Sequence, residues 1–454
     1  MFKNKKIHMI GIGGISMSGI AKILLSFDCQ ITGYDANESD LTKELIQKGI
    51  KVSYTPCLEN VENADIVVYT AAIPKDNEEL VHAEKLNKEL YERSVFFGLM
   101  MKDYKNVLCI CGTHGKSTTT GMVSTIFMEA EKNPTIQIGA ILPLIGGNEH
   151  VGSKEYFIAE ACEYVDSFLD FFPTAEIILD IDNDHLDYFK NLDNIIHSFK
   201  RFTNLLPENG ILVVNNDDEN TLMAVKDYDK KIITYGIKNQ AMYMAKDITF
   251  DNLGHPTYKL YVNNEYKLDI SLSVSGNHNV LNSLAATALS HQYDIDLNTI
   301  KKALYNYHGV GRRFELLGKC NGALVYDDYA HHPSEIKTTY DSVKKTPHKH
   351  EYAVFQGHTF SRTKDHLEEF AKVLSKFENV IIAKIYPARE TNIYNVHEED
   401  LVELIKKNGN NNAIYLDTFD KIANYLKEKV QENDLVITIG AGPINEVANK
   451  LVKE

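Results

Sequence analysis

Short apolar runs alternate with segments of helical periodicity along almost the whole chain. The apolar runs, among them KIHMIGI, NVLCIC and DLVITI, are typical of strands buried on both faces of a sheet. Segments between them, such as GIAKILLSF and DHLEEFAKVLSKF, repeat apolar residues every three or four positions, as one face of a helix does. The alternation predicts an α/β fold built mainly from parallel sheets.

The pattern changes between residues 232 and 275, where short alternating segments are bounded by Asn and Gly. We expect antiparallel strands there, flanking the central sheet. A chain of 454 residues is too long for one ordinary core. We therefore predict three α/β domains: a Rossmann-like N-terminal domain over 1–103, a central domain with a mixed or parallel sheet over 104–310, and a Rossmann-like C-terminal domain over 311–454.

Composition narrows the class of protein further. Hydrophobic content of 44% and charged content of 24% are typical of a soluble globular protein, and the formal net charge of −15 argues against general nucleic-acid binding. No apolar run approaches the ~20 residues of a membrane span, and the N-terminus lacks the pattern of a secretory signal. The six cysteines are scattered, which favours reduced thiols. We expect a cytoplasmic protein, monomeric or homodimeric, without nucleic-acid or membrane partners.

The run GTHGKSTTT, at 112–120, lies between a predicted buried strand and a predicted helix. A glycine-rich turn at such a junction points backbone N–H groups and a helix N-terminus at an anion. Lys116 would reach the β- and γ-phosphates of ATP, and the Ser117 hydroxyl would bind Mg²⁺. The usual pattern has glycine where this chain has Ile110, so a surface turn with a solvated lysine is the alternative. The strand–turn–helix context favours a P-loop ATPase-like central domain.

A second glycine-rich turn, GIGGISMSG, occupies 11–19 near the N-terminus. It is similar to a dinucleotide-binding fingerprint, and Asp35 ends the next predicted strand, where a ribose-binding acid would lie. An NAD(P)-dependent oxidoreductase is therefore one hypothesis. Ser16 stands where the third glycine is expected, and such an enzyme has no need of the ATP turn. There are two alternatives to NAD(P) binding at this turn. It could bind another nucleotide by its diphosphate, or it could be a tight turn without a ligand.

Two further clusters carry candidate chemistry. Asn279 and Asn282 lie three apart on a predicted helix and share a face, where their amides could bind the edge of adenine; a helix cap with a solvated neighbour is the alternative. His331 and His332 follow a predicted strand and could position an amino acid and take its proton. Pro333 beside them equally indicates an ordinary helix start.

The order and spacing of the motifs along the whole chain resemble the Mur ligase family. They are HMIGIGGISMSGIA, GTHGKSTTT, AEACEYVDSFL, DHLDYF, GNHNVLN, GVGRRFE, YDDYAHHPSEI, FQGHTFSRT, YPARE and ITIGAG. The opening GIGGISMSGIA is most similar to the alanine-adding branch. The resemblance implies an enzyme of peptidoglycan precursor synthesis that joins L-alanine to the lactyl carboxylate of UDP-N-acetylmuramate. ATP would convert that carboxylate to an acyl phosphate, with two Mg²⁺ ions neutralising charge.

The resemblance also implies roles for individual residues. The catalytic set would be Lys116, Glu160, His185, His332 and Arg362, and the metal ligands would be Ser117, Glu160 and His185, with Glu163 and Asp187 supporting them. ATP would be bound by Gly112, Thr113, His114, Gly115, Lys116, Ser117, Thr118, Asn279, Asn282 and Arg313. The UDP-sugar would be bound by Gly13, Gly14, Ser16, Met17, Ser18, Asp35 and Thr70. L-alanine would be bound by His331, His332, His358 and Arg362.

The chain departs from the family pattern at a few positions. Ala71 lacks a hydroxyl that relatives carry, which leaves Thr70 as the substitute, and Asp180 stands where relatives often have an amide. Lys200 falls near the position of a carbamylated lysine in some members. A ligase acting on a preformed tripeptide is the nearest alternative function. A nucleotide-binding regulator without turnover is another.

Overall fold

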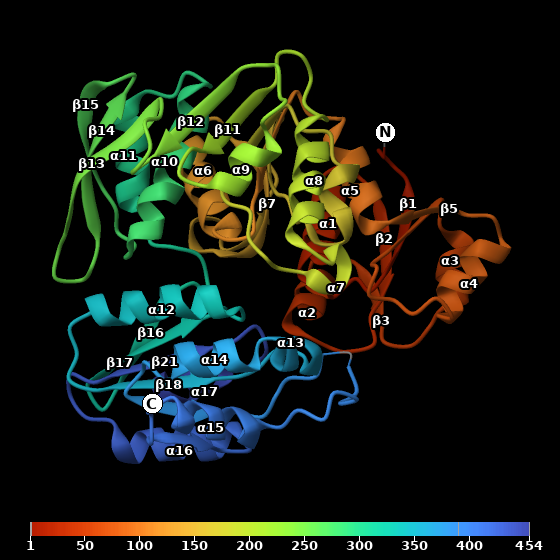
Figure 1. Cartoon of the computed structure of the whole chain (residues 1–454). Helices are drawn as coiled ribbons and strands as arrows, with labels where there is room; N and C mark the ends of the chain where they lie inside the picture. The colour runs from red at the N-terminus through yellow and green to blue at the C-terminus, as the bar shows by residue number, and fades with distance from the viewer. Residues whose placement is uncertain (1, 389, 454) are drawn as a thin grey trace. The chain divides into compact units, whose positions relative to one another are not determined.

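The computed structural model describes residues 2–388 and 390–453. The chain forms two compact units, one made of Met1–Ile248, Tyr258–Ser271 and His278–His308, and the other of Thr249–Thr257, Leu272–Asn277 and Gly309–Glu454. Helices and strands alternate along both, as the periodicity predicts (Figure 1). None of the helices in the described chain is long and apolar enough to cross a bilayer.

The first sheet is parallel, with the strand order β3-β2-β1-β4-β5. Its strands are β1 (Lys6–Ile10), β2 (Gln30–Tyr34), β3 (Lys51–Ser53), β4 (Ile66–Tyr69) and β5 (Glu89–Glu92). Its helices are α1 (Ile15–Leu25), α2 (Asp40–Gln47), α3 (Leu58–Asn63), α4 (Glu78–Lys85) and α5 (Arg93–Met101). The order reverses between β1 and β4, so a crevice for a ligand is expected beyond the carboxyl ends of these two strands.

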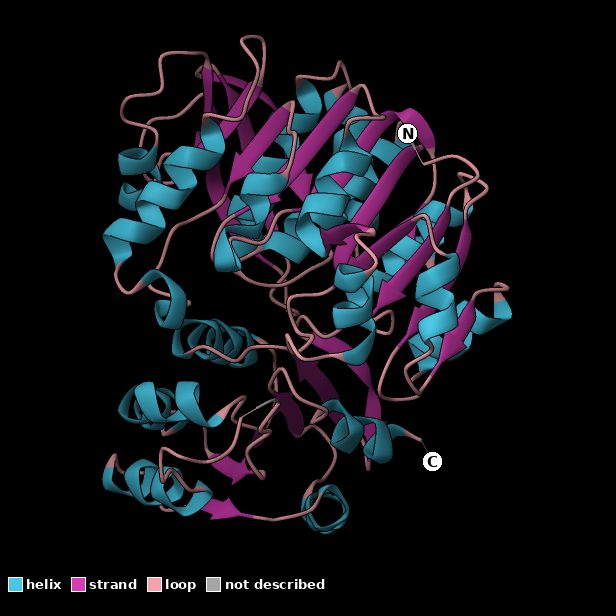
Figure 2. Cartoon of the chain, turned by 90° about the vertical axis from the view of Figure 1, so that its right-hand side faces the viewer, coloured by secondary structure: helices cyan, strands magenta, loops and turns pink. Residues whose placement is uncertain are grey.

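The second sheet has ten strands in the order β15-β14-β13-β12-β11-β10-β6-β9-β7-β8. Its strands are β6 (Asn106–Cys111), β7 (Pro134–Leu142), β8 (Gly147–His150), β9 (Ser153–Glu160), β10 (Ala175–Ile178), β11 (Ile211–Asn215), β12 (Ile232–Gly236), β13 (Tyr243–Phe250), β14 (Pro256–Val262) and β15 (Glu265–Ser271). Its α-helices are α6 (Lys116–Glu129), α7 (Leu186–Phe189), α8 (Leu192–Thr203), α9 (Glu219–Ala224), α10 (Asn277–His291) and α11 (Leu297–Asn306). Two 3-10 helices, η1 (Pro143–Ile145) and η2 (Tyr164–Asp170), complete it. Helices and strands lie in layers (Figure 2).

The expectation of antiparallel strands over 232–275 is wrong for the first two strands of that range. β12 pairs with β13 in parallel, with Tyr235 beside Tyr243. β14 and β15 are joined by Asn263 and Asn264, whose φ angles of 51° and 68° are those of a tight hairpin turn. Local alternation therefore identified half-exposed strands but not the direction in which each one joins the sheet.

The first two sheets share one continuous core. Met9 and Phe97 from the first sheet's layers belong to the same buried cluster as Phe157 and Phe199 from the second. A buried ion pair also joins them, because Nζ of Lys22 lies 3.1 Å from Glu149 on β8 and 2.8 Å from Glu44 on α2. The glycine-rich turns of both sheets are therefore carried by a single compact unit.

The third sheet, in the second unit, has the order β16-β17-β21-β18-β19-β20. Its strands are β16 (Glu315–Cys320), β17 (Ala323–Asp328), β18 (Glu351–Phe355), β19 (Asn379–Ile382), β20 (Ala413–Tyr415) and β21 (Leu435–Ile439). Its helices are α12 (Pro333–Lys345), α13 (Phe360–Asp365), α14 (Leu367–Leu374), α15 (Glu398–Lys407), α16 (Phe419–Lys429) and α17 (Asn445–Val452). Neighbours Val354 and Phe355 enter different cores, so both faces of this sheet are covered.

One buried carboxyl group in the central sheet has no hydrogen-bond partner among the described residues. Glu176 on β10 is fully buried, next in register to Cys109 on β6. Burial raises the pKa of Glu176 well above its usual value, because the charged form is poorly solvated there. The fold therefore favours the neutral form of this side chain.

We expect Glu176→Gln to stabilise the protein at pH 7–8 and to have little effect near pH 4. Because the folded-state pKa is raised, the native state holds a proton that the unfolded state releases above about pH 4.3. In the wild-type protein, the contribution of this group to the free energy of unfolding is fully present below that pH. It falls by about 1.4 kcal/mol per pH unit as the pH rises toward the folded-state pKa. Thermal unfolding at several pH values measures the difference.

Glu79→Gln is the matched control for this prediction. Glu79 is equally buried, but its carboxylate accepts hydrogen bonds from the Cys57 N–H at 2.7 Å and contacts Nε2 of His8 at 3.1 Å. Replacing it should bring no gain in melting temperature. A Glu176→Gln protein that is no more stable than wild type at pH 8 would contradict the assignment of a neutral buried acid.

Candidate active site

The predicted phosphate-binding turn follows β6 and starts α6. Gly112 and Gly115 have φ angles of 139° and 81°, and Gly115 is the residue that precedes the first turn of α6. A Cβ on Gly112 would lie 2.8 Å from that of Leu179, and one on Gly115 would lie 2.7 Å from Oδ1 of Asn282. Both glycines are therefore required by backbone conformation and by close packing.

Lys116, the first residue of α6, turns its side chain back over this turn. Its Nζ donates to the carbonyl oxygens of Gly112 at 2.6 Å and Thr113 at 2.9 Å, and lies 3.0 Å from both carboxylate oxygens of Glu163. Burial alone would lower the pKa of Lys116, but the negative groups around it, Glu163 foremost and Glu160 among them, together outweigh burial and raise the pKa. The ammonium group is thus kept charged at the site where polyphosphate would bind.

The segment after β10 braces the turn from the other side. Thr113 N–H donates to the carbonyl of Asp180 at 3.0 Å, and His114 N–H donates to Oδ1 of the same residue at 2.8 Å. The Thr113 hydroxyl accepts from the Asp182 N–H at 2.8 Å, and His114 Nε2 lies 3.5 Å from the Asp182 carboxylate. Leu179 is held in turn by Asn215, whose amide donates to its carbonyl at 2.9 Å.

Asn279 and Asn282 lie on α10 and face the same way, as the sequence predicts. The Asn282 amide donates to Oδ1 of Asn279 at 3.0 Å, and both side chains are buried. The contact between Asn282 and Gly115 places this pair directly beside the turn. The alternative of a solvated neighbour is therefore wrong for Asn282.

Glu160 ends β9, one strand away from the turn. Its Oε2 accepts the Gly139 N–H at 2.9 Å, and a Cβ on Gly139 would lie 2.9 Å from Oε1. The Ser117 hydroxyl at the start of α6 is buried. A hydroxyl and a carboxylate fit Mg²⁺, which usually takes one or two carboxylates together with substrate phosphates. No cluster of three His, Cys, Asp or Glu side chains suited to a metal occurs among the described residues.

His185 stands just before α7 with a positive φ of 55°. Its Nε2 lies 3.9 Å from Glu163 and 3.7 Å from Asp184, and its ring packs on that of Tyr164 with centroids 4.6 Å apart. The Lys116 ammonium group and the His185 ring therefore both lie close to the Glu163 carboxylate. The side chain of Asp187, its predicted supporter, lies outside the described residues.

The η2 segment that carries Tyr164 is strained and strongly anchored. Val165 and Asp166 have φ angles of 51° and 60°, which non-glycine residues rarely adopt. The Asp166 carboxylate accepts from Tyr188 at 3.0 Å, from Arg201 at 3.1 Å and from the Ser198 hydroxyl. Three donors thus fix a backbone that is unfavourable by itself, beside His185. The sequence analysis missed this anchor, because its donors lie on elements distant in sequence.

The predicted UDP-sugar residues gather at the carboxyl ends of β1, β2 and β4. Gly13 N–H donates to Oδ2 of Asp35 at 2.8 Å, and Thr70 lies against Gly11. Gly14 precedes α1, and Ser16 lies in its first turn. The Met17 side chain enters the core, and Ser18 bonds within its own helix, so these two can reach a ligand only through backbone N–H groups.

Arg93, which the sequence analysis did not single out, joins this group. It begins α5, and its Nη1 donates to Oγ of Ser16 at 3.4 Å. The sequence could have indicated this residue, because Arg93 directly follows β5, a strand of the same sheet.

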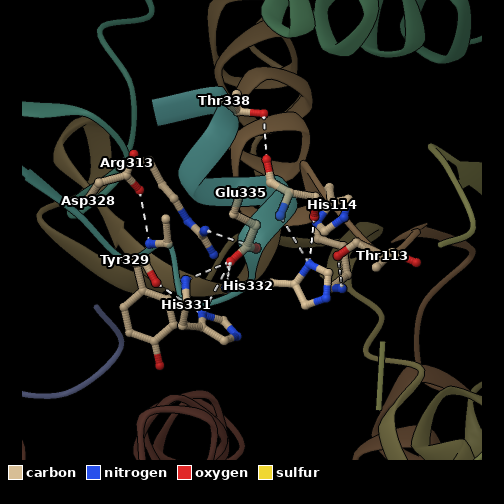
Figure 3. Close-up of polar contacts among 12 residues, drawn as sticks. Thr113, His114, Arg313, Asp328, Tyr329, His331, His332, Glu335 and Thr338 are labelled. Atoms are coloured by element: carbon tan, nitrogen blue, oxygen red, sulfur yellow. Dashed lines mark hydrogen bonds and ion pairs between the residues drawn. The ribbon is translucent and has the colours of Figure 1, made fainter. Parts of the chain in front are cut away.

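The histidine pair of the second unit surrounds the start of α12. The N–H groups of His331 and His332 donate to the Glu335 carboxylate at 2.9 and 3.2 Å, and Arg313 lies 4.0 Å from the same group (Figure 3). His332 precedes α12, and its Nδ1 accepts the Ser334 N–H. The helix-start interpretation is therefore confirmed.

These contacts assign different protonation sites to the two rings. Nδ1 of His331 lies 3.0 Å from the Tyr329 carbonyl, which can only accept, so the neutral ring carries its proton on Nδ1 and its lone pair on Nε2. Nδ1 of His332 accepts from Ser334, so its proton is on Nε2. The two rings thus differ at Nε2, which is an acceptor in neutral His331 and a donor in neutral His332.

His358 and Arg362 lie on either side of Thr359, where α13 begins. Burial, together with the charges of His331 and Arg362, lowers the pKa of His358 to about 4. The His358 ring lies 6.2 Å from that of His331. The His358 ring is therefore neutral at physiological pH, and the charge of the Arg362 guanidinium is one of the reasons.

The two adjacent arginines are held by their neighbours to different degrees. Arg312 donates from Nε to the buried Asp327 carboxylate at 2.8 Å and from Nη2 to the Gly440 carbonyl at 2.7 Å. Arg313 stacks on the Tyr329 ring, 5.2 Å from its centroid. Arg312 is thus fixed by a close pair with a buried acid, whereas the Arg313 guanidinium lies 4.0 Å from Glu335, and Arg313 stays the candidate for phosphate.

One remaining expectation, the carbamylated Lys200, finds little support. Lys200 forms an ion pair with Asp227, which is largely exposed. Nothing in that pairing favours a carbamylated lysine. Arg389, in the motif YPARE, lies outside the described residues.

A Rossmann-like sheet, a sheet with a P-loop-like turn and a third α/β sheet follow one another along the chain, the order found in a class of ATP-dependent ligases. Three family models match the chain in succession: the Mur ligase family catalytic domain over 6–105, the Mur ligase middle domain over 110–290 and the Mur ligase glutamate ligase domain over 312–442. The chain belongs to the Mur ligase family.

The similar proteins point to one branch of that family. UDP-N-acetylmuramate--L-alanine ligases from Caldanaerobacter subterraneus subsp. tengcongensis and Lachnospira eligens are 45% and 48% identical, over 100% and 98% of this chain and 98% of each relative. The crystal structure of UDP-N-acetylmuramate-alanine ligase from Thermotoga maritima has a TM-score of 0.85 at 27% identity, covering 99% of this chain and 98% of that one. A murein peptide ligase from Psychrobacter arcticus, at 22% identity and a TM-score of 0.73, shares the fold. The oxidoreductase hypothesis is not supported.

Proposed function

We propose that this protein is the ATP-dependent ligase that joins L-alanine to the lactyl carboxylate of UDP-N-acetylmuramate. The full-length similarity to ligases named for that reaction supports it most strongly. The phosphate-binding turn with its charged Lys116 supports the use of ATP. In the reaction, a carboxylate oxygen attacks the γ-phosphorus and ADP leaves. The alanine amine then attacks the acyl carbon, phosphate leaves, and the amine loses a proton.

We assign the substrates to the three stretches of chain predicted from the sequence. Residues 1–103 would hold the UDP-sugar, 104–310 ATP, and 311–454 L-alanine. Backbone N–H groups at the start of α1, together with Arg93, would bind the diphosphate. Asn279 and Asn282 would bind adenine, and Arg313 a phosphate.

The chain's own charged groups account for the chemistry that the reaction requires. Lys116 would exchange the carbonyls of the turn for phosphate oxygens and neutralise charge as the phosphoryl group moves. Mg²⁺ ions, held by Ser117 and Glu160 and by His185, would supply further positive charge when bound. Arg362 would bind the carboxylate of L-alanine, and the Nε2 lone pair of His331 would accept the amine proton.

Product analysis separates this proposal from the nearest alternative. Enzyme, Mg²⁺, ATP and UDP-N-acetylmuramate are incubated with L-alanine, with a preformed tripeptide, or with both, and the products are weighed by mass spectrometry. We expect the alanine adduct whenever L-alanine is present, and no tripeptide adduct. A tripeptide adduct without an alanine adduct would assign the chain to the recycling reaction instead.

A further inference from the structure

Asp180 is a half-buried acid directly behind the phosphate-binding turn, and the mechanism above does not use it. Its Oδ1 accepts the His114 N–H at 2.8 Å, and its own carbonyl accepts the Thr113 N–H. Two consecutive N–H groups of the turn are therefore held by one residue. The turn also packs closely here, because a Cβ on Gly112 would lie 3.1 Å from the Asp180 nitrogen.

Charged and titratable groups face Asp180 from each element around it. His114 and Lys116 come from the turn and α6, Asp218 from the start of α9, and Tyr235 from β12. Asp218 is itself fixed, since its Oδ1 accepts the N–H groups of Thr221 and Ile181. Burial raises the pKa of Asp180 to about 6, with His114 opposing the rise and Asp218 adding to it.

We propose that Asp180 is a positioning residue for the phosphate-binding turn, and that nucleotide binding at this turn is coupled to proton uptake by its carboxyl group. The inference rests on the proposed ATP site. A polyphosphate on the turn adds negative charge close to the carboxylate and engages Lys116, one of the cations that favours the ionised form. Both changes favour the protonated acid.

The protonated acid can still hold the turn. A neutral carboxyl group keeps a carbonyl oxygen that accepts the His114 N–H, so its charge is lost without losing the hydrogen bond. The two roles of Asp180 are therefore separable: Asp180→Asn keeps an acceptor for His114 but cannot titrate, whereas Asp180→Ala removes the acceptor.

Calorimetry of ATP binding, in the presence of Mg²⁺, in two buffers of different ionisation enthalpy measures the coupled protons directly. If binding raises the pKa of Asp180 by one unit, the wild-type protein takes up about half a proton on binding ATP at pH 6.5. Its affinity for ATP then rises about fivefold to tenfold from pH 8 to pH 5.5, in addition to any change seen in Asp180→Asn. Asp180→Asn should show no uptake from this group and near-wild-type affinity at pH 6. Asp180→Ala should bind ATP at least tenfold more weakly at every pH.

Subtracting the Asp180→Asn profile removes the titration of ATP, which both proteins share. Asp218→Asn provides a second check, because loss of the neighbouring charge should move the proton uptake to lower pH. Melting temperatures establish that each variant is folded. ATP binding with equal proton uptake in wild type and Asp180→Asn would overturn the inference and leave the proposed function standing. Absence of ATP binding by folded wild type at all pH values would overturn both.

Discussion

Replacing Lys116 with methionine is expected to lower kcat by about 10³-fold, because the variant loses the cation that neutralises the transferring phosphoryl group. The substitution also leaves the Glu163 carboxylate, which is 2% exposed, without its partner. Breaking a buried pair in this way destabilises a protein by about 3–5 kcal/mol. Steady-state kinetics and thermal unfolding measure the two effects separately.

The double variant Lys116→Met/Glu163→Gln separates chemistry from folding. Removing the orphaned charge should restore most of the melting temperature, whereas kcat should stay near that of the single variant. Lys200→Met is the matched control, since that ammonium group pairs with an exposed acid away from the turn. Wild-type kcat in a folded Lys116→Met protein would show that the turn does not carry the reaction.

Gly115→Ala is expected to lower kcat/KM for ATP by about 10²-fold. The new Cβ would lie 2.7 Å from Oδ1 of Asn282, which is buried and bonded to Asn279, so either the turn or the asparagine pair has to move. Displacements of this size near a reacting group have effects of that order. Kinetics with ATP as the varied substrate provide the measurement.

Gly49→Ala distinguishes steric displacement from backbone strain. Gly49 has a φ of 90°, close to the 81° of Gly115, but no atom lies within 4 Å of its hypothetical Cβ. The substitution should cost about 1 kcal/mol of stability and leave kcat/KM unchanged. Equal losses of kcat/KM in both variants would contradict the role of close packing at Gly115.

Features encoded in short stretches of sequence could be predicted. The turn before Lys116 depends on two glycines at a strand–helix junction, and the shared face of Asn279 and Asn282 follows from helical spacing. The helix that begins after His332 is indicated by Pro333 and the residues next to it. Each of these depends on neighbours within a few positions.

Features that depend on distant partners could not be predicted from the pattern. Arg312 and Arg313 are adjacent, and only the buried carboxylate of Asp327 on β17 distinguishes them. The parallel entry of β13 beside β12 is decided by sheet packing rather than by local alternation. The anchoring of Asp166 uses Tyr188 and two residues of α8, and nothing in the sequence links them to η2.

The most direct test of the ligase mechanism is phosphate release from ATP in the presence of Mg²⁺, with UDP-N-acetylmuramate and L-alanine added separately and together. The mechanism predicts steady release only when both substrates are present, because the acyl phosphate forms on one and is discharged by the other. Release that is independent of L-alanine, or absent with both substrates although ATP binds, would contradict it.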